Sequence, residues 1–300
     1  MRVPDLIGNT PLIGLTHFLD RVPGPRLFAK AEFVNPSGSV KDRAARAMIM
    51  AGIQSGELSS GRTIIDATSG NTGISYSMIG ASLGFPVKLY MPSNTSLERK
   101  KVIQIYGASI VETDPLEGSD GAFLTAREEA NNRPDMYFYP DQYNNPENPK
   151  AHFDTTGVEI WNQSRRQVTH FLTGAGTSGT FMGVSRRLKD FNPAIKTALV
   201  QPNSPFHGIE GTKHMGSTIK PGIFDESAVD EVVTVTTEEA YEMTRRLARE
   251  AGILVGVSSG ANVAAAVSYA RTLPEESFVV TVLCDHGSRY LSDGFWEGTK

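Results

Sequence analysis

The segment Thr63-Ile-Ile-Asp-Ala67, which runs into Thr68-Ser-Gly-Asn-Thr-Gly73, indicates the fold more directly than any other part of the sequence. Its first five residues are mainly β-branched or apolar and predict a short strand. A helical pattern follows and extends to Leu83. A strand that leads into a helix through a turn of small polar residues is typical of a βαβ unit in a parallel sheet.

The same alternation of short apolar runs and longer amphipathic segments continues along the chain. The runs that predict strands span residues 27–31, 63–67, 87–91, 109–111, 168–172, 196–200, 232–235 and 278–283. The segments that predict helices span residues 70–83, 96–106, 118–131, 179–189, 237–250 and 259–270. Together they predict an α/β fold with a mainly parallel sheet. In such folds ligands bind beyond the carboxyl ends of the strands, so we expect the chemistry at the strand-to-helix turns.

Composition and charge narrow the class of protein. The 300 residues, 39% of them hydrophobic, suffice for one large domain or two moderate ones. No Pro/Ser-rich linker separates two halves, so a second domain would be interleaved with the first. With 29 basic residues against 33 acidic ones, and a formal charge of −4, nucleic acid is not an expected partner. No apolar run approaches the ~20 residues that cross a bilayer, which argues against a membrane protein.

Cysteine and histidine usage gives no sign of a disulfide or a metal site. Cys284 is the single cysteine and cannot form an intramolecular disulfide. The histidines without paired metal spacing, for which structural or solvated roles are expected, are His152, His170, His207, His214 and His286. The residues after Met1 lack the apolar region of a secretory signal, so we expect a cytoplasmic enzyme.

Lys41 lies in the run Asn35-Pro-Ser-Gly-Ser-Val-Lys-Asp-Arg43, between a turn and a helical segment that continues to Met50. We therefore expect it in the first turn of a helix. The positive end of the helix dipole opposes an ammonium group there and favours the neutral amine. A neutral amine is a nucleophile toward aldehydes. The alternative, a solvated surface lysine, does not account for the turn that precedes it.

Two turns rich in small polar residues offer anion sites at helix starts. Thr68–Gly73 combines hydroxyls, an amide side chain and backbone N–H groups, which suits a carboxylate or a phosphate better than a simple helix cap. Thr173-Gly-Ala-Gly-Thr-Ser-Gly-Thr180 follows the expected strand at 168–172, and its glycines let the backbone approach a phosphate closely. It formally matches the dinucleotide pattern, but the next strand does not end in the expected acidic residue. We therefore expect it to bind a single phosphate.

The residues alone leave two further features open. Gly256-Val-Ser-Ser-Gly260 is either a plain capped helix start or a ligand contact, and Gln142 is either a turn residue or a substrate contact. A reactive lysine, a carboxylate-binding turn and a monophosphate cradle together suggest pyridoxal 5'-phosphate, whose aldehyde needs the amine and whose phosphate needs the cradle. A nicotinamide dehydrogenase that uses the glycine-rich turn is the alternative from another enzyme class.

Six separated motifs resemble those of the cysteine synthases, the pyridoxal-phosphate enzymes of fold type II that make cysteine from O-acetylserine. They are Gly8-Asn-Thr-Pro-Leu12, Asn35–Arg43, Thr68–Gly73, Asp141-Gln-Tyr-Asn-Asn-Pro146, Gly176-Thr-Ser-Gly-Thr180 and Val257-Ser-Ser-Gly260, in the order and spacing of the family. The resemblance implies a tryptophan synthase β-like architecture of two interleaved three-layer αβα domains that form a single catalytic unit over residues 1–300. We expect a smaller, mobile subdomain at 40–150 and a larger, cofactor-binding one at 1–39 plus 151–300.

The resemblance also implies roles for individual residues. Lys41 would form the internal Schiff base and later move the proton of the substrate's Cα. The cofactor would further contact Asn71, Gly176, Thr177, Ser178, Gly179, Thr180 and Ser258. The substrate carboxylate would be bound by Thr68, Ser69, Gly70, Asn71, Thr72 and Gln142. Ser258 would face the pyridine nitrogen, and a hydroxyl cannot keep that nitrogen protonated as an aspartate would, which favours loss of a β leaving group.

By this resemblance the protein is a transferase of cysteine biosynthesis. Acetate would leave O-acetyl-L-serine to give an aminoacrylate, to which sulfide adds. The B-type isozyme is favoured over the A-type by Thr155-Thr-Gly-Val-Glu-Ile-Trp161, by the short path from Ser204–Gly208 to Pro221–Phe224, and by Cys284-Asp-His-Gly-Ser-Arg-Tyr-Leu291. B-type enzymes are associated with bulkier nucleophiles such as thiosulfate. Glu210 stands where phosphoserine-using relatives would offer a basic residue, which disfavours O-phosphoserine.

Alternatives within the same fold are an O-phosphoserine-dependent cysteine synthase, a cystathionine β-synthase-like enzyme and a serine/threonine dehydratase. A non-catalytic regulator is an alternative from another class, which the intact Lys41, Asn71 and phosphate loop argue against. The family resemblance implies a homodimer and names serine acetyltransferase as a further partner.

Overall fold

The structure is a computed structural model that describes residues 1–20, 23–68 and 70–297. The chain forms two compact units, each assembled from two separate stretches. The first unit consists of Met1–Ile7 and Asn35–Asn148, and the second of Gly8–Val34 and Pro149–Lys300. The interleaved α/β architecture predicted from the sequence is therefore confirmed. Residues 1–7 and 35–39, grouped from sequence with the larger subdomain, lie in the first unit.

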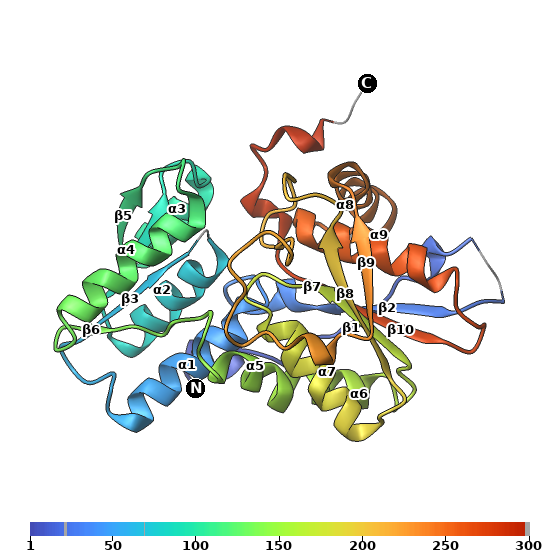
Figure 1. The fold of residues 1–300 in the computed structure, drawn as a ribbon, viewed down its shortest axis with the longest axis horizontal. Coiled ribbons are helices and arrows are strands. Elements are labelled where there is room, and N and C mark those ends of the chain that lie inside the picture. Colours follow the sequence, from blue (N-terminus) through green and yellow to red (C-terminus); the bar gives the residue numbers. More distant parts are fainter. Residues whose placement is uncertain (21–22, 69, 298–300) are drawn as a thin grey trace. The chain divides into compact units, whose positions relative to one another are not determined.

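The first unit is built on a parallel sheet with the strand order β5-β4-β3-β6. Its strands are β3 (Thr63–Ala67), β4 (Val87–Pro92), β5 (Ser109–Thr113) and β6 (Tyr137–Phe138). Its helices are α1 (Lys41–Ser55), α2 (Asn71–Leu83), α3 (Leu97–Ile105) and α4 (Gly118–Asn132). Helices α1, α2 and α3 cover one face of the sheet and α4 covers the other, which makes three layers (Figure 1).

Helices bury both faces of this sheet, and the side chains along each strand alternate between the two faces. Ile64 packs with Ile49 on the side of α1 and α2, and the next residue, Ile65, packs with Ala122 on the side of α4. Each of the two adjacent isoleucines therefore fills a core of its own. Ile7 packs against the cluster that contains Ile64, which explains why residues 1–7 belong to this unit.

The second unit contains a sheet with the strand order β1-β2-β10-β7-β8-β9, in which β1 runs antiparallel to β2 and the other neighbours are parallel. Its strands are β1 (Leu12–Gly14), β2 (Arg26–Ala31), β7 (His170–Gly174), β8 (Lys196–Pro202), β9 (Glu231–Val235) and β10 (Phe278–Leu283). Its longer helices are α6 (Gly157–Gln163), α7 (Gly179–Phe191), α8 (Thr237–Ala251) and α9 (Val257–Ala270). Helices α8 and α9 cover one face, and α6 and α7 the other (Figure 1).

Short helical segments connect these elements. Helix α5 (Glu147–Ala151) continues through a π-helix (His152–Thr156) into α6. Single 3-10 turns span Val3–Leu6, Thr16–Phe18, Glu32–Val34, Glu226–Ala228, Gly287–Arg289 and Gly294–Trp296. Within the described ranges no helix combines the length and the apolar character that a membrane span requires.

Local sequence signals explain several helix ends. Helix α8 begins with a capping box, in which Thr236 Oγ1 accepts from the Glu239 N–H at 3.1 Å and the Glu239 carboxylate accepts from the Thr236 N–H at 2.8 Å. Helices α1, α2 and α8 each end at a glycine in the left-handed conformation, namely Gly56, Gly84 and Gly252. Glycine adopts this conformation without the steric cost that a Cβ would add.

A close approach between α7 and the π-helix depends on Gly183. A Cβ at this position would lie 2.1 Å from the carbonyl oxygen of Pro149 and 2.7 Å from the Cβ of His152. We expect Gly183→Ala to lower the free energy of unfolding by about 1–3 kcal/mol, because backbone must move to make room. Gly294→Ala is the control, since a Cβ there meets nothing within 4 Å. Urea denaturation of both variants tests this, and equal stability of the two would contradict it.

Candidate cofactor and substrate site

The turn between β3 and α2 carries most of the residues predicted to bind a carboxylate. Buried Thr68 accepts, through Oγ1, hydrogen bonds from the N–H groups of Gly70 at 3.0 Å and Gly73 at 3.2 Å. Asn71 is the first residue of α2 and Thr72 the second. The first turn of a helix presents N–H groups that the helix itself cannot satisfy, and its positive dipole end attracts anions. The turn is therefore suited to a carboxylate.

Gln142, whose role the sequence left open, lies against this turn. Its Nε2 donates to the carbonyl oxygen of Ala67 at 2.9 Å, and its Oε1 accepts from the Thr72 hydroxyl at 2.8 Å. The Asn148 side chain donates to the Gln142 carbonyl oxygen at 2.7 Å. The structure thus brings Gln142 together with the start of α2. Ser69, also predicted for this loop, lies outside the described residues.

Lys41 is the first residue of α1, so its predicted place at the start of a helix is confirmed. It is half-buried, and its backbone N–H donates to Ser39 Oγ at 3.3 Å. Gly38 adopts a left-handed conformation with φ of 84°, and its N–H donates to the Asn35 carbonyl oxygen at 2.7 Å. This closed turn determines where α1 begins.

Asp66 is a buried acid in β3, two residues before Thr68. It accepts hydrogen bonds from the Tyr76 hydroxyl at 2.9 Å and from the Ala67 N–H at 2.8 Å. Burial, together with the nearby charge of Asp141, raises the pKa of Asp66 to about 7, although these hydrogen bonds act to lower it. Near neutral pH this carboxyl group is therefore divided between its protonated and charged forms.

In the second unit, the turn between β7 and α7 has the features of a phosphate cradle. A Cβ on Gly176 would lie 2.5 Å from the carbonyl oxygen of Gly211, so the position requires glycine. Ser178, with φ of 71°, immediately precedes Gly179, the first residue of α7. Ser178 Oγ is buried and has no hydrogen-bond partner within the part of the chain that the structure describes. An orphan hydroxyl at a helix N-terminus fits a phosphate oxygen as its missing partner.

The segment around Glu210 lies beside this cradle. The Lys213 N–H donates to the carbonyl oxygen of Ala175 at 2.8 Å. The side chain of Thr212 would lie 3.1 Å from a Cβ placed on Gly174. The segment that carries Glu210 therefore lies next to the loop predicted to bind the phosphate.

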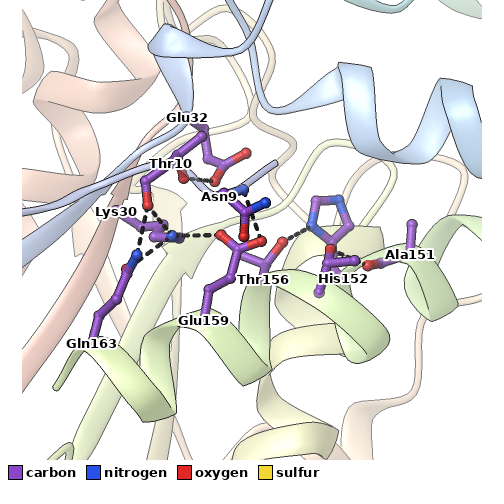
Figure 2. A network of polar contacts seen from close by, with 10 residues as sticks. Asn9, Thr10, Lys30, Glu32, Ala151, His152, Thr156, Glu159 and Gln163 are labelled. Carbon is purple, nitrogen blue, oxygen red and sulfur yellow. Dashed lines mark hydrogen bonds and ion pairs between the residues drawn. The ribbon is translucent and has the colours of Figure 1, made fainter. Parts of the chain in front are cut away.

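His152, in the π-helix, contacts the cradle through Thr180. The imidazole is buried, with Nε2 3.3 Å from Thr180 Oγ1 and Nδ1 2.9 Å from Thr156 Oγ1 (the latter contact in Figure 2). Of the structural and solvated roles expected for this histidine, burial leaves the structural one. Its contact orients a hydroxyl of the predicted phosphate loop, and π-helical turns often occur at functional sites.

One turn beyond Thr156, Glu159 takes part in a buried ionic network (Figure 2). Lys30, a residue of β2, is completely buried. Its Nζ lies 2.6 Å from Glu159 Oε2 and donates to Gln163 Oε1 at 2.9 Å. The Asn9 N–H donates to Glu159 Oε1 at 3.1 Å. These contacts attach α6, and the π-helix that leads into it, to β2 and to the Gly8–Leu12 motif.

Ser258 lies inside α9, as its second residue, and the buried Asn262 follows one turn later. Asn262 Oδ1 accepts from the Gly174 N–H at 2.7 Å, and its Nδ2 donates to the Val282 carbonyl oxygen at 2.9 Å. Residues four apart share a helix face. Ser258 is therefore on the face of α9 that meets the carboxyl ends of β7 and β10, the edge from which the phosphate loop starts.

The predicted site residues thus form two groups. The first unit holds Lys41, Thr68, Gly70, Asn71, Thr72 and Gln142. The second unit holds Gly176, Thr177, Ser178, Gly179, Thr180 and Ser258. Over residues 1–20, 23–68 and 70–297, no cluster of three or more His, Cys, Asp or Glu side chains could hold a metal ion. An amine with a carboxylate-binding turn, and separately a phosphate cradle, fit a cofactor that carries an aldehyde and a phosphate.

Three further residues that shape the site were not predicted from the sequence. Asp42 and Asn262 had detectable signals, because an acid in a first helical turn is favoured by the dipole and Asn262 follows Ser258 by one turn. Asp66 interrupts an apolar strand, which is a weaker signal. For Asp42 and Asn262, the partners Ser75 and Gly174 lie 33 and 88 residues away along the chain.

Comparison with known proteins shows similarity over nearly the whole chain. A family model described as "Pyridoxal-phosphate dependent enzyme" matches residues 3–285. Cysteine synthase from Aquifex aeolicus is 52% identical over 292 residues, covering 96% of this chain and 89% of that protein. Cysteine synthase B from Escherichia coli is 42% identical over 288 residues, covering 96% and 93%. The crystal structure of cysteine synthase (OASS) from Entamoeba histolytica superposes with a TM-score of 0.92 at 33% identity, covering 99% of this chain and 91% of that one.

The raised pKa of Asp66 predicts a pH dependence of stability. Because the folded pKa of about 7 exceeds the ordinary value of 3.8, the stability that this group contributes is complete below pH 3.8 and is lost as pH rises through 7. At roughly 1.4 kcal/mol per pKa unit, the loss is on the order of 4 kcal/mol. Asp66→Asn should remove this pH dependence, and Asp135→Asn, at an exposed position of the same unit, should keep it. Urea denaturation between pH 4 and 8 measures both, and parallel curves for wild type and Asp66→Asn would refute the assignment.

Proposed function

This chain belongs to the pyridoxal-phosphate-dependent enzyme family and, within it, to the cysteine synthases, and from that premise we propose that it makes L-cysteine by replacing the acetate of O-acetyl-L-serine with sulfide. The fold type and the cofactor class that the six motifs implied are confirmed by this membership, and so is the relation to the B-type enzymes that other segments indicated. The observation that carries the proposal is local. In one unit, an amine begins α1 while the start of α2 presents the Thr68–Thr72 turn with Gln142.

The proposed cofactor contacts follow from the family resemblance. The turn Gly176–Thr180 would bind its phosphate, and the orphan hydroxyl of Ser178 and the close approach at Gly176 support this role. Lys41 would bond to its aldehyde carbon, and Asn71 would donate to its ring hydroxyl. Ser258 would face its ring nitrogen. Once bound, the cofactor ring accepts the electron pair that remains when the substrate loses its Cα proton.

The chain's own residues would orient the substrate and move one proton. Thr68, Ser69, Gly70, Asn71, Thr72 and Gln142 would bind its carboxylate. With the carboxylate held, the substrate's amino group would displace Lys41 from the aldehyde carbon, and the freed Lys41 amine would remove the Cα proton as a general base. The Cβ–O bond then breaks and acetate leaves with its electron pair. Hydrosulfide forms the new Cβ–S bond, and Lys41 returns the proton to Cα.

Two polar side chains bear on the choice of leaving group. The Ser258 hydroxyl would leave the cofactor ring less electron-withdrawing than a carboxylate partner would. The negative charge at Cα is then less strongly stabilised, which favours elimination of the β leaving group. Glu210 belongs to the segment that contacts the phosphate loop through Lys213 and Thr212, and by the family resemblance its negative charge would repel the phosphate of O-phosphoserine. The first feature supports loss of a β leaving group, and the second supports acetate over phosphate as that group.

The remaining expectations belong to the same proposal. We propose that the first unit is the mobile one that binds the substrate carboxylate, and that the second anchors the cofactor. From the sequence we expected bounds of 40–150 for the first unit and 1–39 plus 151–300 for the second. The two units differ from these bounds at residues 1–7 and 35–39, which lie in the first unit, and at residues 149–150, which lie in the second. A homodimer, serine acetyltransferase as a partner and thiosulfate as a second sulfur donor follow from the family resemblance, and a cytoplasmic location belongs to the same proposal.

Product analysis tests the reaction. The purified protein with pyridoxal phosphate, O-acetylserine and sulfide should form cysteine and acetate in equal amounts. O-phosphoserine should react more slowly, because the negative charge of Glu210 repels its phosphate. A parallel assay uses thiosulfate in place of sulfide. A keto acid formed from serine or threonine, with no cysteine from O-acetylserine, would instead indicate a dehydratase.

A second prediction concerns Lys41. The wild-type protein with cofactor should be yellow, and Lys41→Ala should lose that absorption because the covalent link is gone. Loss of the general base should also lower the rate of cysteine formation by about 10²–10⁴-fold. Absorption spectra and steady-state kinetics measure both effects. An active, yellow Lys41→Ala protein would remove Lys41 from the mechanism.

A further inference from the structure

A buried carboxylate beside Lys41 has no part in the reaction as described. Asp42 is the second residue of α1, and its side chain is completely inaccessible to solvent. A charged carboxylate is costly to bury unless it is well hydrogen-bonded, so its partners show what it does in the fold. These partners come from outside α1.

Asp42 joins the turn before Lys41 to helix α2. Its Oδ2 accepts from the Ser37 N–H at 2.7 Å, and its Oδ1 contacts the Ser37 hydroxyl. The same Oδ1 accepts from the Ser75 hydroxyl at 2.5 Å. Ser75 is one turn beyond Asn71, whose carbonyl oxygen lies 3.0 Å from Ser75 Oγ. One carboxylate therefore connects the turn, the start of α1 and the first turn of α2.

We propose that Asp42 is a positioning residue that holds the Lys41 amine in register with the Asn71–Thr72 end of α2. The proposal rests on the proposed function, in which Lys41 moves the Cα proton of a substrate whose carboxylate is bound at that end. Hydrogen bonds to a carboxylate are shorter and stronger than those between neutral groups. Two of them hold the Ser37 turn against the start of α1, and the third, from Ser75, resists a shift of α2 against that start. An error of about 1 Å at a reacting group costs about 100-fold in rate.

A purely structural role makes a different prediction. An acid in the first turn of α1 stabilises the helix through its dipole, so its loss would lower stability and nothing else. Positioning predicts in addition that the cofactor attaches to Lys41 more slowly. It also predicts a lower kcat with a smaller change in KM, because the residues that bind the substrate carboxylate are unchanged.

The test compares Asp42→Asn, Ser75→Ala and a matched control. Ser77→Ala is the control, since Ser77 is also a buried serine of α2 but donates to the Gly73 carbonyl oxygen at 2.7 Å. Each full-length protein is mixed with pyridoxal phosphate, reduced with borohydride at timed intervals, and the cofactor fixed on Lys41 is measured by mass spectrometry. Urea denaturation and the kcat and KM for O-acetylserine complete the comparison.

We expect Asp42→Asn to lower the labelling rate of Lys41 and to reduce kcat about 10–100-fold, with KM much less affected. Ser75→Ala should shift the same quantities in the same direction by less, and Ser77→Ala should match wild type. The proposal is wrong if Asp42→Asn and Ser75→Ala lose stability but keep wild-type labelling and kcat, or if Ser77→Ala shows the same defects.

Two further outcomes remain informative. If Asp42→Asn does not fold, Ser75→Ala decides by the same measurements, because it removes one hydrogen bond and no charge. If wild type is labelled at Lys41 but does not convert O-acetylserine, the proposed function fails, and the labelling rates of the variants still decide the role of Asp42.

Discussion

The constraint on which the structure depends is that a parallel strand must pass into a helix before the chain returns to the sheet. The start of a helix that follows such a strand, with its unsatisfied N–H groups and positive dipole end, is therefore at the edge formed by the carboxyl ends of the strands. In the first unit this places the Thr68–Gly73 turn before α2, and in the second the Gly176–Thr180 turn before α7. Both turns are proposed as anion sites for the same reason, and that reason is topological.

Hydrogen bonds from a few buried side chains hold these edges in shape. Thr68 closes its own turn through two backbone N–H groups, and Asn262 ties α9 to the ends of β7 and β10. Asp42 does the same for α1 and α2. Such groups are stable inside a protein when their hydrogen bonds are made, and each of these side chains satisfies backbone or hydroxyl groups that would otherwise be buried alone.

The division of labour between chain and cofactor follows from this arrangement. Removal of a proton from Cα requires an electron acceptor that amino-acid side chains do not provide, and the cofactor supplies it. The chain contributes an amine, two anion sites and their geometry. Asp66 adds an acid under the carboxylate-binding turn whose pKa burial raises to about 7, so the electrostatics of the turn change with pH in the physiological range.

The sequence by itself determined the α/β class, the bounds of β3, the place of Lys41 at the start of a helix and the six family motifs, because each depends on neighbours within about ten residues. It placed the strand at 168–172, where the structure has His170–Gly174, and it missed the antiparallel strand β1, the π-helix and the assignment of residues 35–39 to the first unit. Only the tertiary structure decided that Asp42 meets Ser75, that Asn262 reaches Gly174 and that His152 reaches Thr180. Such pairs lie 28 to 88 residues apart and are joined by packing of whole helices and strands, which no local pattern records.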